Sequence, residues 1–523
     1  MYDAIIVGSG PAGTAAALGL KGKNCLVLDV GRDASEVPKC FRGSQVELES
    51  SQQDLFDFYV GADYSSLQNL DRTPQINLKL KSPFNKFIID GFEELTPIES
   101  SNFAGVISLS KGGLANGWGA GVFRYNDEDL KEFPICYRDL KKHYDELALE
   151  IGISGSKDDL FESFLEEPSL QAPILLSRFA LALNEAYQKK RQYINELGVI
   201  IGRGRLAVLT QETNGRSAYQ YENAEFFRVR DPAVYSPAYS LDRLIQDRLV
   251  EYRDKYLVES FEESEGCVTV HARNVDDGSI SKYCAKRLFL AAGTLNTARI
   301  VLKSNADSRT KLPILDNPLT AFPLLKPSLI GEKISATDCS LGQLVAVSRL
   351  SPESLPIQSA IFGTNGPLRS DVLANLPLPL NVTRRVMNLT AAATGLVMNF
   401  HPGKLHSTNY LRLGGKEALE VNYEPEKQSM EGESQLIKAL GSLGFFSHRS
   451  LIENIPMGSS LHFAGAFPMK HVPSRYQTDK FGLLYGSSNV HIVDGACFSA
   501  LPAKNHTFTI MANSLRIVKS VLG

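Results

Sequence analysis

Two polar side chains stand directly before an apolar segment near the end of the chain. Asn505 and His506 precede Thr507 in LPAKNHTFTIMANSLRI, and apolar residues then recur at spacings of three and four, which predicts a buried helix over 507–521. An asparagine alone is enough to cap such a helix. An amide beside an imidazole also fits a pair that contacts a substrate while the helix behind it supplies rigid support.

A glycine motif near the start of the chain has the spacing of a dinucleotide-binding turn. An apolar strand leads into Gly8, Gly10, Ala12 and Gly13 of GSGPAG, and a helix follows. In such motifs the glycines allow a tight turn, close approach of a pyrophosphate and close packing of helix on strand, and the helix start favours phosphate. Asp29 ends a second strand 21 residues after Gly8 (29 − 8), where an acid would bind ribose hydroxyls.

A second approach to the nucleotide is predicted much later in the chain. The segment RLFLAAGTLNTARI reads as a buried strand, a turn at Gly293 and a helix. NAD and FAD share the glycine motif. The long separation between Asp29 and Gly293 favours a flavoprotein with a large insertion over a compact NAD domain.

The elements that position these residues alternate between strands and helices. Helical spacing is evident at 138–150, 178–197 and 240–256, and a further helix is expected at 433–443. An alternating segment with a turn at 276–278 predicts a β-meander that runs into the strand before Gly293. The mixture indicates an α/β fold in which a nucleotide-binding domain is interrupted by a second domain.

Taken together, the two ends of the chain resemble the glucose–methanol–choline (GMC) oxidoreductase family. The resemblance rests on GSGPAG, Asp29, LAAGTLNTARI and NVHIVDGACFSALPAKNHTFTIMANSLRI; it is moderate at SKGGLANGWGAGVFRY and faint over 310–430. It implies a Rossmann-type FAD-binding domain with a discontinuous α+β substrate-binding domain. The expected boundaries are 1–50, 106–150, 245–310 and 480–523 for the FAD domain, 51–105 for a lid or excursion, and 151–244 and 311–479 for the substrate domain.

The resemblance also assigns roles to single residues. Gly112, Gly113, Asn116 and Trp118 would line the flavin and its diphosphate, and Val258 would meet the adenine through its backbone. Asp494, Gly495 and Thr507 would lie against the pyrophosphate and the ring. His462 matches the family's histidine above the flavin. Asn505 matches its second catalytic position, but His506 follows where many members carry proline, so either residue could face the substrate.

These assignments predict oxidation of a CH–OH group by FAD. Hydride transfer to flavin N5 requires removal of the hydroxyl proton, and a histidine with a pKa near 6.5 suits that task, so His462 is the expected base. Asn505 or His506 would hold the alcohol oxygen. The expected substrate is a sugar or another secondary alcohol, and the electron acceptor stays open between oxygen, a quinone and a protein. The alternative is a lyase or isomerase in which FAD is structural and His462 performs acid–base chemistry.

Bulk properties exclude several other classes. The 523 residues carry a net charge of −3 without a basic stripe, so nucleic acid is not an expected partner. No apolar run reaches the roughly 18 residues of a membrane span. The seven cysteines are scattered and no cluster has metal-ligand spacing, so no metal is expected. With no signal segment ahead of the first strand, the expected location is the cytoplasm.

Overall fold

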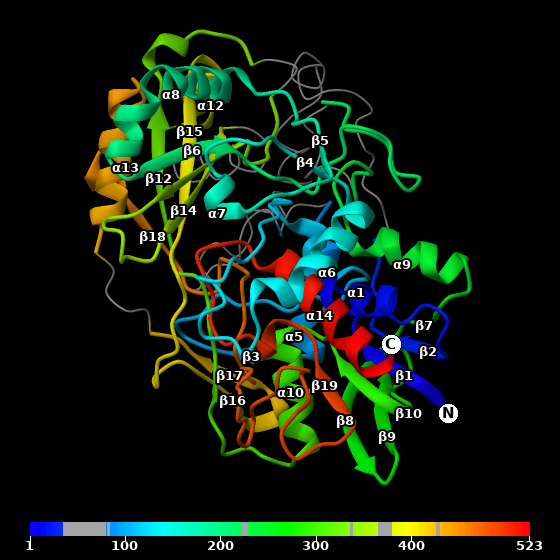
Figure 1. Ribbon diagram of the computed structural model, residues 1–523. Coiled ribbons are helices and arrows are strands. Elements are labelled where there is room, and N and C mark those ends of the chain that lie inside the picture. The colour runs from blue at the N-terminus through cyan, green and yellow to red at the C-terminus, as the bar shows by residue number, and fades with distance from the viewer. Residues whose placement is uncertain (35–79, 81–83, 222–228, 335–337, 365–378, 425–428) are drawn as a thin grey trace.

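Two large sheets organise the chain (Figure 1). The computed structural model describes residues 1–34, 80, 84–221, 229–334, 338–364, 379–424 and 429–523. Within these residues the helices are α1 (Pro11–Gly19), α5 (Phe92–Leu95), α6 (Tyr137–Ile151), α7 (Phe161–Phe164), α8 (Arg178–Glu196), α9 (Pro237–Gln246), α10 (Thr294–Ser304), α12 (Leu380–Thr390), α13 (Glu431–Ser442) and α14 (Thr507–Leu522).

The first sheet has strand order β7-β2-β1-β10-β9-β8, with β19 also paired to β10. Its strands are β1 (Tyr2–Val7), β2 (Cys25–Leu28), β7 (Glu251–Arg253), β8 (Tyr256–Ser264), β9 (Cys267–Asn274), β10 (Ile280–Leu290) and β19 (Val490–Ile492). β1, β2, β7, β10 and β19 are parallel, whereas β8 and β9 run antiparallel as the predicted meander. Ala4 to Val7 are buried, as expected for a central parallel strand covered on both faces.

The terminal helix is part of the core of this first layer. α14 lies beside α1 and α6 (Figure 1), and the Ser514 hydroxyl donates to the Ala12 carbonyl at 2.7 Å. Tyr144 of α6 and Thr509 of α14 share a hydrogen bond of 2.7 Å between their hydroxyls. The last helix is therefore fixed to the helix that follows the glycine turn.

The second sheet is antiparallel, with strand order β18-β12-β15-β14-β13-β6. Its strands are β6 (Val199–Arg203), β12 (Leu319–Leu325), β13 (Leu344–Ser348), β14 (Ile357–Gly363), β15 (Thr394–Phe400) and β18 (Glu453–Ile455). α8 and α13 cover one face, where Leu183 and Leu440 pack with Phe322, Ile361 and Val397. The opposite face is directed to the functional site described below.

Smaller elements join the two layers. A sheet of order β11-β16-β17-β3 comprises β11 (Leu312–Pro313), β16 (Tyr410–Leu413), β17 (Leu419–Asn422) and β3 (Ile98–Glu99), and β4 (Ile153–Ser154) pairs with β5 (Leu170–Gln171). Single 3₁₀ turns are η2 (Lys86–Ile88), η3 (Gly113–Gly117), η4 (Pro327–Leu329), η5 (Gly415–Glu417), η6 (Arg449–Leu451) and η7 (Gly495–Cys497). Among the residues described, no helix is long and apolar enough to cross a bilayer.

Two predictions about local structure need comment. The helix expected over 240–256 is wrong in its second half: α9 ends at Gln246, Arg248 adopts a φ of +56°, and residues 251–253 form β7 against β2. Most of the predicted lid, 51–79 and 81–83, lies outside the described residues. Its later part forms η2, α5 and β3, and β3 pairs with β17.

A buried polar group anchors α13 beneath the second sheet. Glu433 accepts hydrogen bonds from the Thr320 hydroxyl at 2.7 Å and from His401 Nε2 at 2.9 Å. Burial alone would raise the pKa of Glu433, but the hydrogen bonds from His401 and Thr320 hold it below its usual value. The folded state therefore stabilises the carboxylate.

We expect Glu433→Gln to destabilise the protein at pH 7, because replacing a charged acceptor removes about 1–3 kcal/mol of hydrogen bonding. Since the folded pKa lies below the unfolded one, the carboxylate stabilises the fold above about pH 4.3 and loses this effect as the pH falls through the folded pKa. Thermal melts at pH 7, 5 and 3.5 should show the two proteins converging at the lowest pH. Glu431→Gln, at an exposed position of the same helix, is the control; an equal deficit at all three pH values would contradict the prediction.

Candidate active site

A cavity opens where the parallel strands of the first sheet end. Gly8, Asp29 and Ala291 directly follow β1, β2 and β10, Asp494 follows β19 by two residues, and all four line the cavity. The carboxyl edge of parallel strands is the usual ligand-binding edge of α/β folds. From there the cavity extends to the second sheet, where Phe400 forms part of its wall.

The glycine turn brings main chain to the cavity wall. Gly8 has a φ of +96°, and a Cβ there would lie 2.6 Å from the Ala291 carbonyl oxygen. A Cβ on Gly13 would lie 1.9 Å from the carbonyl oxygen of Gly8, so α1 can approach β1 only because this residue has no side chain. α1 begins at Pro11, and its first turn leaves backbone N–H groups without partners inside the helix. An anion can bind at such a position.

Asp29 is joined to the turn by Ser9. The Ser9 hydroxyl donates to Asp29 and accepts from the backbone N–H of Gly112 at 3.0 Å. Burial raises the pKa of Asp29 to about 6, although the hydrogen bond from Ser9 opposes this shift. Ser9 thus links three separate segments of the wall.

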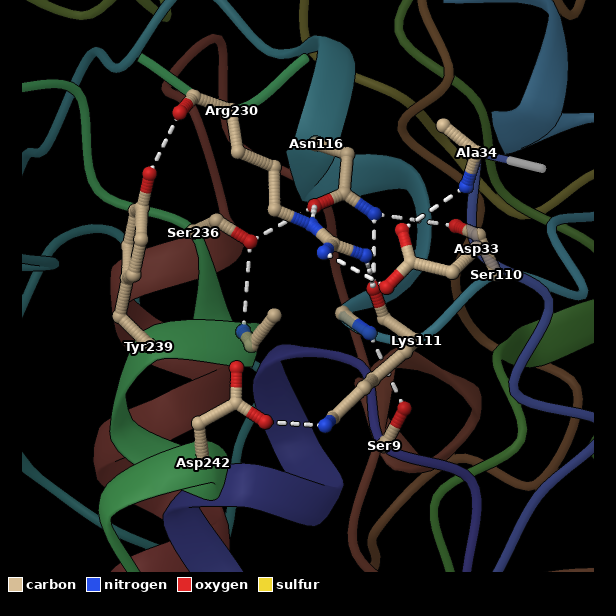
Figure 2. A network of polar contacts seen from close by, with 12 residues as sticks. Ser9, Asp33, Ala34, Ser110, Lys111, Asn116, Arg230, Ser236, Tyr239 and Asp242 are labelled. Atoms are coloured by element: carbon tan, nitrogen blue, oxygen red, sulfur yellow. Dashed lines mark hydrogen bonds and ion pairs between the residues drawn. The ribbon is translucent and has the colours of Figure 1, made fainter. Parts of the chain in front are cut away.

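Asn116 and Arg230 make hydrogen bonds to the loop that contains Ser110 and Lys111 (Figure 2). Asn116 Nδ2 donates to the Lys111 carbonyl at 2.9 Å, and Asn116 Oδ1 accepts from the Ser236 hydroxyl at 2.6 Å and from Arg230 at 3.2 Å. Arg230 also donates to the Lys111 carbonyl at 3.0 Å and pairs with Asp33. The hydrogen-bonding groups of Asn116 are therefore engaged within the protein.

Asp494 fixes the opposite side of the cavity. One carboxylate oxygen accepts from the Gly293 backbone N–H at 2.9 Å and from the Thr297 hydroxyl at 2.5 Å, and the other accepts from the Ala496 N–H at 2.9 Å. Burial raises the pKa of Asp494 to about 6, against these three hydrogen bonds. Asp494 joins the start of α10 to η7 and so sets the position of Gly495.

His462 has one ring nitrogen engaged by Asn317. His462 Nδ1 lies 2.9 Å from Asn317 Oδ1, while Asn317 Nδ2 donates to the carbonyls of His401 at 2.8 Å and Pro502 at 3.0 Å. Because these carbonyls can only accept, the Asn317 oxygen must face the imidazole, and Nδ1 must carry the proton. In the neutral ring Nε2 therefore carries the lone pair, the form required of a base.

The loop before His462 is held by a buried carboxylate. Asp316 accepts from the Gly458 N–H at 2.6 Å and from the Ser460 hydroxyl, and that hydroxyl accepts from the His462 N–H at 2.9 Å. Burial raises the pKa of Asp316 to about 7, although these hydrogen bonds oppose the shift. Asp316 and Asn317 are adjacent and fix the backbone and the ring of His462 respectively.

Asn505 and His506 approach His462 in different ways. Asn505 Nδ2 lies 3.5 Å from His462 Nε2, and Asn505 Oδ1 accepts from Gln358 Nε2 at 3.3 Å. The His506 ring makes an edge contact with the His462 ring, with centroids 4.6 Å apart. Burial lowers the pKa of His506 to about 3, so this ring is neutral at physiological pH. Neither side chain caps α14, whose N-cap position is His506.

Most of the residues predicted from the sequence meet at the cavity. The lining includes Gly8, Gly10, Ala12, Asp29, Gly113, Trp118, Val258, Gly293, His462, Asp494, Gly495, Asn505, His506 and Thr507. Gly13, Gly112 and Asn116 are not among the described residues that line the cavity. Their predicted contacts, and the catalytic roles of the others, remain predictions.

Sequence reasoning missed three side chains of the site. Ser9 lies inside the glycine motif, so its position between Gly8 and Gly10 was a usable signal. Asn317 and Gln358 fall in the stretch 310–430, where no motif surrounds them. Long-range folding alone brings these two amides to His462 and Asn505.

Comparisons with known proteins agree with the fold. No family model matches the sequence. The crystal structure of pyridoxine 4-oxidase from Mesorbium loti is similar over 99% of both chains, with a TM-score of 0.60 and 14% sequence identity. A stretch of 121 residues is 28% identical to 6'''-hydroxyparomomycin C oxidase from Streptomyces lividus and spans 22% of this chain and 21% of that protein. The first similarity covers the whole architecture, and the second covers about a fifth of each sequence.

We expect the Asn317 amide to set the tautomer of His462. In the unaltered protein the ¹⁵N spectrum of labelled histidine should show His462 with a protonated Nδ1 and an unprotonated Nε2. In Asn317→Ala the amide that selects this form is absent, and the signals should move toward a mixture of tautomers. Asn422→Ala removes a half-buried asparagine of β17 and is the control. A pure Nδ1–H tautomer in Asn317→Ala would contradict the assignment.

Proposed function

We propose that this chain, which has the fold of the GMC oxidoreductases, is an FAD-dependent enzyme that oxidises a CH–OH group. The observation that supports the proposal is the hydrogen bonding of His462. Its Nδ1 pairs with Asn317 Oδ1, so the lone pair of the neutral ring is on Nε2, which lies beside Asn505 in the cavity. The same cavity begins at the glycine turn of β1 and α1.

The residues of the first sheet fit an FAD molecule. The main chain at Gly8 and Gly10, together with the N-terminus of α1, would hold the diphosphate. Asp29 at the end of β2 would bind ribose hydroxyls, and Val258 of β8 would lie at the adenine. When bound, the flavin supplies the acceptor for the hydride that leaves the alcohol carbon.

His462 and Asn505 would divide the work on the alcohol. Nε2 of His462 accepts the hydroxyl proton as the carbon loses its hydride, so the product is a carbonyl compound. The Asn505 amide donates to the alcohol oxygen and keeps the carbon in place, a contribution of several kcal/mol in well-oriented sites. His506 packs against the base and stays neutral. We therefore place Asn505, rather than His506, against the substrate.

The sequence expectation is a sugar or another secondary alcohol, with an open choice of electron acceptor; the proposed oxidation of a CH–OH group does not depend on either choice. The substrate class and the electron acceptor can both be identified by following the absorption of the flavin. A panel of primary, secondary and polyhydroxy alcohols, mixed without oxygen, should include at least one class that bleaches the flavin absorption. Subsequent addition of oxygen, a quinone or a protein acceptor would identify what restores it.

We expect Gly8→Ala to purify without flavin, because its Cβ would lie 2.6 Å from the Ala291 carbonyl at a φ unfavourable for alanine. Absorption spectra and FAD released by heat measure the occupancy. Gly22→Ala is a matched control, since Gly22 also has a positive φ, +85°, but no atom lies within 4 Å of its Cβ position. Full occupancy in Gly8→Ala would contradict the placement of the diphosphate, and a colourless unaltered protein would exclude FAD.

We expect His462→Ala to keep its flavin and to lose roughly 10²- to 10⁴-fold in the rate of bleaching by the best alcohol, the usual contribution of a general base. His406→Ala changes an exposed histidine and should bleach at the unaltered rate. If the protein instead turns over a substrate with its flavin replaced by a redox-inactive analogue, the lyase or isomerase alternative is correct and oxidation is not the function.

A further inference from the structure

The second sheet presents a single face to the cavity. Side chains alternate between the two faces of a strand, and residues paired across strands share a face. Gln358 pairs with Phe400 and Ala360 with Met398, and Phe362 continues this face along β14. The cavity wall contributed by the second sheet comprises Leu319, Val345, Gln358, Ala360, Phe362, Met398 and Phe400. Intervening residues such as Ile361 and Val397 pack under the helices.

This wall is apolar with one amide at its centre. Three aromatic rings border this part of the cavity: Phe362 and Phe400 from the sheet, and Phe123 from the facing loop. Phe400 also stacks on the His462 ring, with centroids 5.4 Å apart. None of the described residues that line the cavity along the second sheet carries a formal charge. The charged lining residues all come from outside the second sheet: Asp29, Glu259, Arg273, Arg299, Lys303, Glu417 and Asp494.

Gln358 has its orientation imposed through a chain of hydrogen bonds. Asn317 fixes the tautomer of His462, so Nε2 can only accept, and Asn505 must present its NH₂ group to it. Asn505 Oδ1 then faces Gln358, which must present its own NH₂ group.

Gln358 lines the cavity, and its carbonyl oxygen is buried without a partner among the described residues. Gln358 is 2% exposed, and its Oε1 has no hydrogen-bond partner among the described residues. An unsatisfied buried acceptor is costly unless a ligand supplies the missing donor.

We infer that the substrate is an uncharged alcohol with a flat apolar body, an aromatic ring or its equivalent, and a second hydrogen-bond donor that Gln358 Oε1 accepts. This inference rests on the proposed function and narrows it. Gln358 is then a specificity-determining residue: it selects a donor on the body of the substrate while Phe362, Phe400 and Met398 enclose the apolar part. A sugar, with polar groups on all sides, would leave several hydroxyls unpaired against this wall.

The test compares matched alcohols in anaerobic flavin reduction. The probes are benzyl alcohol, the 2-, 3- and 4-hydroxybenzyl alcohols, their methyl ethers, and the polyols sorbitol and glucose. At least one hydroxybenzyl alcohol should reduce the flavin with a second-order rate constant roughly 10- to 100-fold above that of its methyl ether, the usual effect of leaving a buried acceptor unpaired. All benzyl alcohols should exceed both polyols.

Gln358→Leu distinguishes loss of recognition of the second hydrogen-bond donor from a general loss of activity. Its overall rates will fall, because Gln358 also supports Asn505, but the ratio between the hydroxybenzyl alcohol and its ether should drop to about one. Ser359→Ala changes the adjacent residue on the helix-covered face, where its hydroxyl donates to Asn399 at 2.7 Å, and should keep the ratio.

Three outcomes would overturn the inference. Polyols that bleach faster than every benzyl alcohol would leave the oxidase proposal standing and refute the substrate class. A ratio that survives in Gln358→Leu would refute the role of this residue. Failure of all the alcohols, and of the wider panel described above, would refute the proposed function itself and this inference with it.

Discussion

The amide of Asn317 is the constraint on which the geometry of the site depends. Its NH₂ group donates to carbonyls contributed by His401, at the end of β15, and by Pro502, in the segment before α14. These carbonyls cannot donate, so rotation of the amide would place oxygen against oxygen and leave buried groups unpaired. The tautomer of His462 is therefore a property of the assembled tertiary structure. It exists only when the second sheet and the terminal segment have both reached their native positions.

The two sheets contribute different chemistry because they expose different parts of the chain. The first sheet offers strand ends, where Gly8, Gly293 and the carboxylate of Asp29 line the cavity beside the start of α1. A helix start suits phosphates, and a carboxylate suits hydroxyls. The second sheet offers a strand face, where every other side chain points the same way and the wall is apolar apart from Gln358. α14 connects the two sheets, because Asn505 just before its start lies beside His462 and its body packs on α1.

Local signals in the sequence predicted the first sheet better than the second. The glycine turn, Asp29, the meander and the terminal helix each have a short-range pattern, and the structure contains all of them. The second half of the helix expected over 240–256 is wrong because pairing of residues 251–253 with β2 outweighs helical spacing. No local pattern separates Asn317 or Gln358 from other polar residues in strands or loops. Asn317 and Gln358 matter because of the side chains that the fold places beside them. Those partners, His462 and Asn505, lie more than 100 residues away in the sequence.

The sequence leaves open whether Asn505 or His506 contacts the substrate. The two side chains differ in whether their neighbours fix the direction of their donor and acceptor atoms. An amide can donate and accept, and here Gln358 and His462 together dictate which end does which. His506 Nδ1 has no hydrogen-bond partner within the described residues, and its ring is neutral because burial lowers its pKa to about 3. A group without a fixed donor would hold an alcohol oxygen less well than Asn505, whose NH₂ group lies 3.5 Å from His462 Nε2. His506 instead packs edge-on against the His462 ring, with centroids 4.6 Å apart.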